Sequence, residues 1–305
     1  PSLVLELARL EKDLVGDGWE VIRRDVSRTE SVVNVKAMIV SLYSLDPSNT
    51  KTLFLFGHIP VPYSGYAAAD GHANHRGAWS SDSFYADMDG VWTDATVNTT
   101  ESIWTRNHNI PGDGKYDQNV PPTAVELEIG RVDLANMSYY SGGKNEVELL
   151  RQYLDKDHAF RHKKMHFKKR SIMHSNFGNW GNTIPGANAY LANSAFFGAG
   201  NLTVAAPTNV LRTPANDTYL YAHGDGGGWM GGASGIGNSQ LMSQLNPQVA
   251  FWTLWGSWFG DWDDNLYNYN FLRQPLVSPY GLTSIWIGQC HWNPHGLAMG
   301  DTFGS

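Results

Sequence analysis

The sequence of 305 residues has little cysteine and little charge. Its one cysteine is Cys290, so no disulfide can form within the chain. Charged residues make up 17% of the chain, and the acidic excess gives a formal net charge of -7. We therefore expect no nucleic-acid partner, because such a balance repels phosphate. No apolar stretch approaches the roughly 18 residues that a membrane-spanning helix needs, so we expect no transmembrane segment.

Aromatic residues and glycine are abundant instead. The chain has 12 Trp, 14 Tyr and 32 Gly, and 42% of its residues are hydrophobic. This composition is typical of a compact, loop-rich protein and not of a disordered one. The length is sufficient for one large core or two smaller ones.

The hydrophobic pattern alternates between helical and extended segments. Helical spacing covers residues 2–15, 33–43, 145–158 and 187–197, and extended apolar runs cover residues 19–25, 52–56, 125–132, 170–174, 219–221, 249–254 and 282–287. Such alternation predicts an α/β fold with a mostly parallel central sheet and crossover helices on both faces.

Residues 57–122 interrupt this pattern. They are rich in Gly, Pro, Asp, His, Asn and aromatic residues, and they show little periodicity. We interpret them as a long, ordered, loop-rich insertion, since loops of this length in a compact domain are usually functional or stabilised by ions.

Two polar side chains follow buried strands. His223 comes after a short apolar run and before Gly224, and Ser257 follows the strand at 249–254 on a glycine-flanked turn. Ligands in parallel sheets bind at the carboxyl ends of strands, and a hydroxyl on a tight turn there is exposed by geometry. A histidine and a serine at neighbouring strand ends suit base-activated attack on a carbonyl, although each alone is usually structural.

The order of the motifs resembles the gingipain-like cysteine peptidases, which have a caspase-like fold. That family carries His-Gly at one strand end and Cys-X-X-Gly-Asp-aromatic at the next, and here His223-Gly224 precedes Ser257-Trp258-Phe259-Gly260-Asp261-Trp262 by 34 residues. Residues 81–85, 128–132 and 289–294 resemble its Ser-Asp-X-X-Tyr segment, its Ile-Gly-Arg strand and the strand end that lines the specificity pocket. The serine replaces the family's nucleophilic cysteine.

The resemblance implies a fold, an activity and a location. The fold would be a single caspase-like three-layer sandwich over residues 1–305, part of a longer bacterial chain that is secreted or displayed at the cell surface. In peptide hydrolysis Ser257 would attack, His223 would accept its proton, Asp157 or else Asp155 would orient the imidazole, and Gly224 would help to hold the oxyanion. Trp292, Asp261 and Trp258 would contact the polypeptide substrate.

Three interpretations of Ser257 remain open. It can be the nucleophile of a working Ser-His hydrolase, or an engineered replacement of cysteine. It can also mark a silent binding or structural module with a protein partner, in a homo-oligomer or larger assembly. Cys290, with His291 and His295 nearby, is a rival nucleophile, although a small core residue is the simpler interpretation.

Two groups of residues are candidate metal ligands. Spaced carboxylates in glycine-containing loops suit calcium, which the resembled family binds as a structural ion; here they are Asp82, Asp87, Asp89, Asp94, Asp113 and Asp117. Local turn hydrogen bonds are the alternative role for these residues. The second group, Asp70, His72 and His75, has ligand types that zinc prefers, but it lacks an identifiable fourth ligand.

Overall fold

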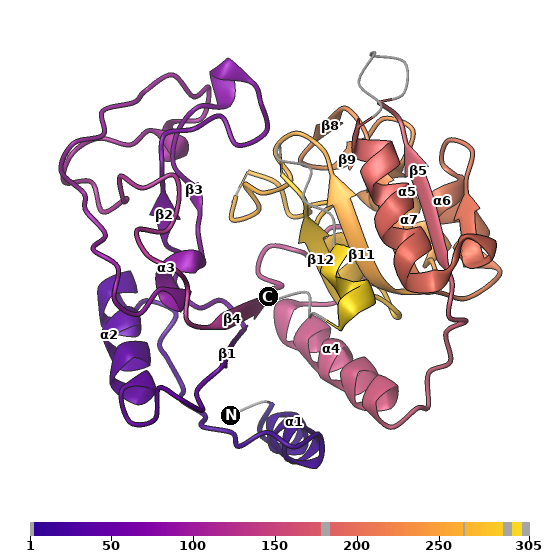
Figure 1. Ribbon diagram of the computed structural model, residues 1–305, viewed down its shortest axis with the longest axis horizontal. Helices are drawn as coiled ribbons and strands as arrows, with labels where there is room; N and C mark the ends of the chain where they lie inside the picture. Colours follow the sequence, from indigo (N-terminus) through magenta and orange to yellow (C-terminus); the bar gives the residue numbers. More distant parts are fainter. Residues whose placement is uncertain (1–2, 178–183, 265, 289–294, 301–305) are drawn as a thin grey trace. The chain divides into compact units, whose positions relative to one another are not determined.

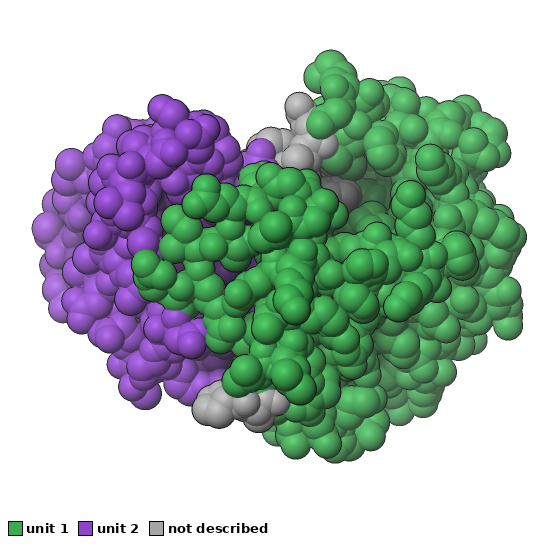
Figure 2. All heavy atoms as spheres, turned by 90° about the horizontal axis from the view of Figure 1, so that it is seen from below, with its two compact units in different colours: residues 1–24, 134–303 green, residues 25–133, 304–305 purple. Residues whose placement is uncertain are grey.

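The computed structural model describes residues 3–177, 184–264, 266–288 and 295–300. The chain forms two compact units, coloured separately in Figure 2. The first comprises Pro1–Arg24 and Leu134–Phe303, and the second comprises Asp25–Asp133 and Gly304–Ser305. The loop-rich region 57–122 lies within the second unit.

A five-stranded parallel sheet forms the centre of the first unit (Figure 1). Its strands, in the order in which they pair, are β12 (Thr283–Trp286), β11 (Val249–Trp255), β7 (Tyr219–Asp225), β5 (Ser171–Ser175) and β6 (Leu202–Val204). Every pair is parallel. The predicted mostly parallel sheet is therefore confirmed for this unit.

Helices cover both faces of this sheet. Ile172, Ala222 and Trp252 are paired across three strands and share one buried cluster with residues of α6 (Asn209–Arg212) and α7 (Ser239–Leu245). Side chains alternate between the two faces of a strand, so their chain neighbours point the other way. On that opposite face Phe160 of α4 (Glu146–Arg161) packs edge-on against Phe251, and Phe197 of α5 (Ile184–Phe197) lies near Tyr221. The expected α/β sandwich is present.

The strand order contains a change of direction. The chain runs from β5 outward to β6, then crosses back over β5 to β7 and continues to β11 and β12. Numbered by their sequence, the strands have the order 2-1-3-4-5, a common doubly wound order. Ligand sites in such sheets lie at the carboxyl ends of the strands beside this switch, which here are the ends of β5 and β7.

Two further helices and three short strands complete the first unit. Helix α1 (Val4–Gly16) packs against α4, which begins with a capping box formed by Asn145 and Glu148. Helix α8 (Gln274–Val277) precedes β12, and the glycine-rich segment after β7 folds into β8 (Gly228–Trp229), β9 (Gly232–Ala233) and β10 (Gly237–Asn238). Short 3-10 turns occupy Ala199–Asn201, Thr213–Ala215 and His295–Met299.

The second unit is built on a parallel strand pair. Strand β1 (Thr52–Phe56) pairs with β4 (Glu128–Val132), and α2 (Val32–Tyr43), capped by the Ser31 hydroxyl, lies against them. Its buried cluster contains Val35, Ile39, Leu55, Phe84, Tyr85, Ala86 and Leu127.

The loop-rich region is ordered by aromatic packing and polar contacts. It contains only short elements: β2 (Tyr63–Ser64), Ala73–His75, β3 (Trp79–Ser80), α3 (Ser83–Ala86) and Thr105–Asn107. The Phe84 ring stacks on Tyr116 with centroids 4.3 Å apart, and Trp92 packs edge-on against both rings. The prediction of an ordered, irregular segment is confirmed.

Two predictions about strands are wrong. Residues 19–25 form no strand, and most of them, including Trp19 at 47%, are exposed, so the alternating pattern does not mark a buried face. A short continuous apolar run such as residues 52–56 predicts a strand covered on both faces, but β1 is not, since Leu55 is its buried residue and Phe54 is 41% exposed. A short apolar run thus identified the strand correctly but not its burial.

Among the helices that the structure describes, none has the length and apolar character needed to cross a bilayer.

Candidate functional site

The candidate base, His223, is locked inside the sheet. It lies on β7, opposite Thr253 of β11, and has 0% exposed surface. Its Nδ1 lies 2.9 Å from the Thr253 hydroxyl, and its Nε2 lies 2.7 Å from Asp225 Oδ2. Both ring nitrogens therefore have hydrogen-bond partners.

The contacts of His223 belong to a longer buried chain of polar groups. Tyr221 Oη lies 2.8 Å from the same Thr253 hydroxyl, and Ser175 donates its hydroxyl to the other oxygen of Asp225. All these residues point to the same face of β5, β7 and β11, because they are paired or separated by two positions. The chain of contacts ends with Ser175 and Asp225, at the switch point between β5 and β7.

The acid beside His223 is Asp225, and the prediction that Asp157 holds the imidazole is wrong. Asp157 lies on α4, where it accepts a hydrogen bond from Arg161 at 2.9 Å. Burial raises the pKa of Asp157, and Arg161 acts against that rise. Asp155, the second candidate, pairs with Arg9 at 2.6 Å. Asp225 was missed although it stands two residues after His223, a spacing that places both side chains on one strand face.

Ser257 lies on a turn directly after β11. Phe259 donates its backbone N–H to the carbonyl of Gly256 at 3.3 Å, and Trp258 has a φ of 66°. Glycine normally takes a positive φ at this turn position, so a tryptophan there stores backbone strain of the kind found at functional sites. Ser257 is 5% exposed.

Glycine backbone lies directly against this turn. A Cβ on Gly228 would lie 2.6 Å from Gly256 Cα and 2.8 Å from the backbone nitrogen of Ser257. Gly224, expected to supply an oxyanion donor, lies within β7 and pairs with His174 and Leu254. Its backbone is therefore part of the sheet, and the glycine next to Ser257 is Gly228.

The expected substrate-contacting residues have different surroundings. Trp258 is 7% exposed and Asp261 is fully buried, with its backbone N–H bonded to the carbonyl of Trp258. Trp292 lies outside the described residues, as do Cys290 and His291. The structure thus places His223 within β7, two residues before the strand end where it was expected, and Ser257 on the turn after the adjacent strand β11. Asp157 lies on the separate helix α4.

The six aspartates proposed as calcium ligands do not form one cluster. Asp94 accepts the backbone N–H groups of Gly112 and Gly114, both at 2.7 Å. Asp113 pairs with Lys115 at 3.1 Å. These contacts are local hydrogen bonds and ion pairs, the alternative role that the sequence allowed.

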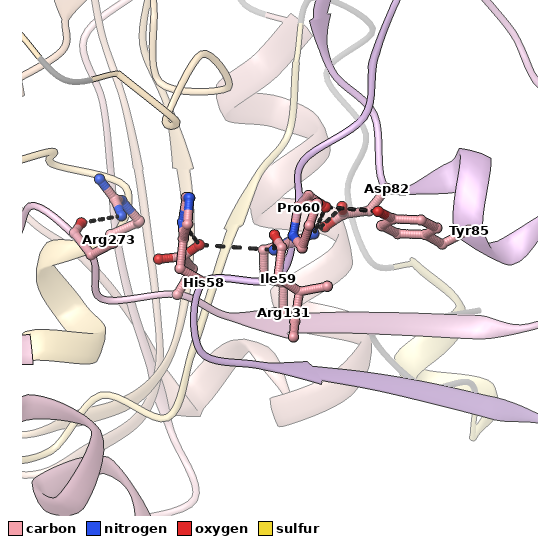
Figure 3. Close-up of polar contacts among 9 residues, drawn as sticks. His58, Ile59, Pro60, Asp82, Tyr85, Arg131 and Arg273 are labelled. Carbon is pink, nitrogen blue, oxygen red and sulfur yellow. Dashed lines mark hydrogen bonds and ion pairs between the residues drawn. The ribbon is translucent and has the colours of Figure 1, made fainter. Parts of the chain in front are cut away.

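Asp82 serves as an anchor for the second unit (Figure 3). Its carboxylate receives two hydrogen bonds of 2.8 Å from Arg131, whose guanidinium also donates to the carbonyl of Ile59. Tyr85 donates to the carbonyl of Pro60 at 2.8 Å. At the ends of β1 and β4, His58 Nδ1 lies 2.8 Å from Asp133. This network ties α3 to the segment after β1.

Asp87 and Asp89 come close to a third carboxylate, that of Glu126. Among the described residues these three bring ligand atoms within 4.8 Å of one another. Asp87 already accepts hydrogen bonds from Gly90, Trp92 and Thr123. Calcium binding stays a prediction, and the carboxylates of this cluster are the ones that could hold the ion together.

Asp117 is held by a ring of donors from residues 93–97. Burial alone would raise its pKa, but hydrogen bonds from Val97, Thr93, Ala95 and Thr96 outweigh burial and lower that pKa to about 2. The carboxylate thus closes the loop by accepting hydrogen bonds.

We predict an acid-sensitive loop as a result. Because folding lowers the pKa of Asp117, its stabilising contribution is complete above the unfolded value near 3.8 and is lost as pH falls toward about 2. Replacing Asp117 with alanine should lower the free energy of unfolding by about 2 kcal/mol at pH 7. It should also flatten the pH dependence between about pH 4 and pH 2, measured by urea denaturation. An unchanged slope in the variant would contradict this assignment.

Asp70 and His75 form a buried hydrogen-bonded contact and not a convergent zinc site. The His75 Nδ1 hydrogen-bonds to Asp70 Oδ2, and the His72 ring packs beside His75 with centroids 4.8 Å apart. Burial lowers the pKa of His75, while Asp70 acts in the opposite direction. Among the residues that the structure describes, these three are not one of the groups whose ligand atoms converge within 4.8 Å.

Comparisons with protein-family models, with curated proteins and with solved structures find no match to this chain.

Proposed function

We propose that this chain is a gingipain-like peptidase domain of caspase-like fold that has lost hydrolytic activity and acts as a binding or structural module. The observation that carries the proposal is the state of His223, whose two ring nitrogens are bonded to Thr253 and Asp225. A general base needs a ring nitrogen directed at the hydroxyl that it activates. In this arrangement both nitrogens of the His223 ring are engaged within the sheet, so His223 does not serve as the base for Ser257.

The serine at position 257, where the resembled family has cysteine, also favours loss of hydrolytic activity. A thiol ionises near neutral pH, whereas a serine hydroxyl needs a well-placed base to become a nucleophile. The parallel sheet, the placement of His223 on β7 and of Ser257 after the adjacent strand β11, and the strained turn at Trp258 support descent from a peptidase. The engagement of both His223 ring nitrogens supports loss of the peptidase reaction.

Exposed aromatic rings favour a protein partner. Trp229 is 49% exposed, and its ring flanks Gly231 together with the ring of Tyr269. Tyr267 and Tyr139, 40% and 67% exposed, lie 5.5 and 5.8 Å from Tyr269 between ring centroids. Exposed tyrosine and tryptophan are enriched in protein interfaces, so these rings suit contact with a polypeptide in a secreted or cell-surface assembly.

An activity-probe experiment tests the loss of hydrolysis. We expect no Ser257-dependent labelling by a fluorophosphonate and no cleavage of unfolded casein, because both ring nitrogens of His223 are already bonded to Thr253 and Asp225. The matched variants are Ser257→Ala and Ser257→Cys, the latter also carrying Cys290→Ser so that thiol probes report one position. Labelling of the unmodified chain that disappears in Ser257→Ala would overturn the proposal. Casein cleavage by the cysteine variant would show that His223 can act as a base, and would contradict the observation on which the proposal rests.

A further inference from the structure

A series of polar contacts joins α1 to α4 within the first unit. Glu6 accepts a hydrogen bond from Arg151 at 2.7 Å, and Arg9 donates to Asp155 at 2.6 Å. Helix α1 itself buries Leu10. With so little apolar burial, polar groups supply much of the specificity of this helix pairing.

The next contact along both helices is different in its chemistry. Asp13 of α1 faces His158 in the last turn of α4 and His162, the residue that caps the helix. Its Oδ2 lies 2.7 Å from His158 Nδ1 and its Oδ1 lies 2.8 Å from His162 Nε2. Histidines four residues apart lie on the same side of a helix, and their ring centroids are 4.2 Å apart. The three ligand atoms all lie within 4.8 Å of one another.

We propose that Asp13, His158 and His162 bind a divalent transition-metal ion, with zinc as the best-matched ion. Two imidazole nitrogens and one carboxylate oxygen are zinc ligands, each bound at about 2.0–2.2 Å. Ligand atoms around one such ion lie about 3–4 Å apart, so modest side-chain movement is sufficient. The ion would replace the protons that now link the carboxylate to the two rings.

The charges around the three residues also favour a cation. Asp17 and Asp157 both pair with Arg161, and Asp13 lies near enough to Asp157 to act on its charge, so three carboxylates gather around this end of α4.

The exposure of the ligand side chains is suited to a site that is partly open to solvent. The Asp13 side chain is 7% exposed, whereas those of His158 and His162 are 23% and 49% exposed. Zinc is usually four-coordinate, so three protein ligands leave one position for water. Occupation would link the N-terminal helix of the unit to α4.

A metal titration on the full chain, freed of metal by a chelator, tests the site. We expect one zinc ion to bind in calorimetry at this site, and cobalt to give the visible absorption of a low-coordinate site. His162→Ala should weaken zinc binding at least 100-fold and should abolish both the cobalt spectrum and the zinc-dependent rise in melting temperature. His162 is half exposed, so its replacement should leave the fold intact, as circular dichroism would verify.

The control is His166→Ala, which removes an exposed histidine from the segment that follows α4 but lies outside the cluster. It should bind zinc as the unmodified chain does, and Asp13→Asn should behave like His162→Ala. Zinc binding that persists in His162→Ala, or that is lost in His166→Ala, would overturn the proposal. The absence of zinc binding in the unmodified chain would overturn it as well.

Discussion

Replacement of Asp225 with alanine is expected to lower the free energy of unfolding by about 3–5 kcal/mol. The carboxylate accepts from Ser175 and contacts His223 Nε2, and all three groups lie in or beside a sheet buried on both faces. Without it, a fully buried imidazole nitrogen loses its partner and a cavity remains. Denaturation with urea, followed by far-UV circular dichroism, measures the loss.

Ser175→Ala is the matched control for this prediction. It removes the other polar contact of Asp225 but leaves the pairing of His223 intact, so we expect a loss of about 1 kcal/mol. A smaller loss for Asp225→Ala than for Ser175→Ala would contradict the buried pairing that the structure assigns to His223.

The second large effect is expected at Gly228. A methyl group there would stand 2.6 Å from Gly256 Cα and 2.8 Å from the Ser257 backbone nitrogen, and neither backbone atom can move without shifting the turn. We expect Gly228→Ala to lower the free energy of unfolding by about 1–3 kcal/mol, as overpacking does in other cores. It should also displace the Ser257 turn, visible as shifted backbone resonances of residues 256–259 in NMR spectra.

The neighbouring Gly227 provides the control. It is exposed, a Cβ there would meet no atom within 4 Å, and its φ lies outside the left-handed region. Gly227→Ala should therefore be neutral or stabilise by about 0.5 kcal/mol through the unfolded state. Equal effects of the two substitutions would show that Gly228 does not pack against Ser257.

Both substitutions bear on the silent-site proposal. Asp225 holds one ring nitrogen of His223, and the lack of a side chain at Gly228 lets the glycine segment approach the Ser257 turn. Because fold alone does not establish function, the fluorophosphonate and casein assays are the test of whether the chain hydrolyses peptides.

The apolar pattern was sufficient to locate most regular elements. It predicted β1 at residues 52–56 and placed β5, β11 and β12 within one residue at either end. It ended β7 at residue 221 because the glycines that follow are typical of turns, whereas the strand runs to Asp225. Because the predicted strand ended at Tyr221, the pattern did not predict that Asp225 shares a strand face with His223.

Contacts between distant segments were beyond the reach of the pattern. Nothing in the local sequence of residues 11–15 indicates that Asp13 meets His158 and His162, which are 145 and 149 residues away. Likewise, the aspartates of the loop region looked alike in sequence. In the structure Asp82 pairs with Arg131, whereas Asp117 accepts hydrogen bonds from residues 93–97.

Local order in this chain thus followed from residue type and spacing, because propensity and amphipathic period act within a few residues. The sequence alone placed His223 and Ser257 at successive strands and predicted a parallel sheet between helices. Which acid meets the imidazole, whether a ring nitrogen remains available, and which carboxylates converge were decided by tertiary packing. Hydrogen bonds and ion pairs depend on distances of a few ångströms between side chains, and only the folded chain sets those distances.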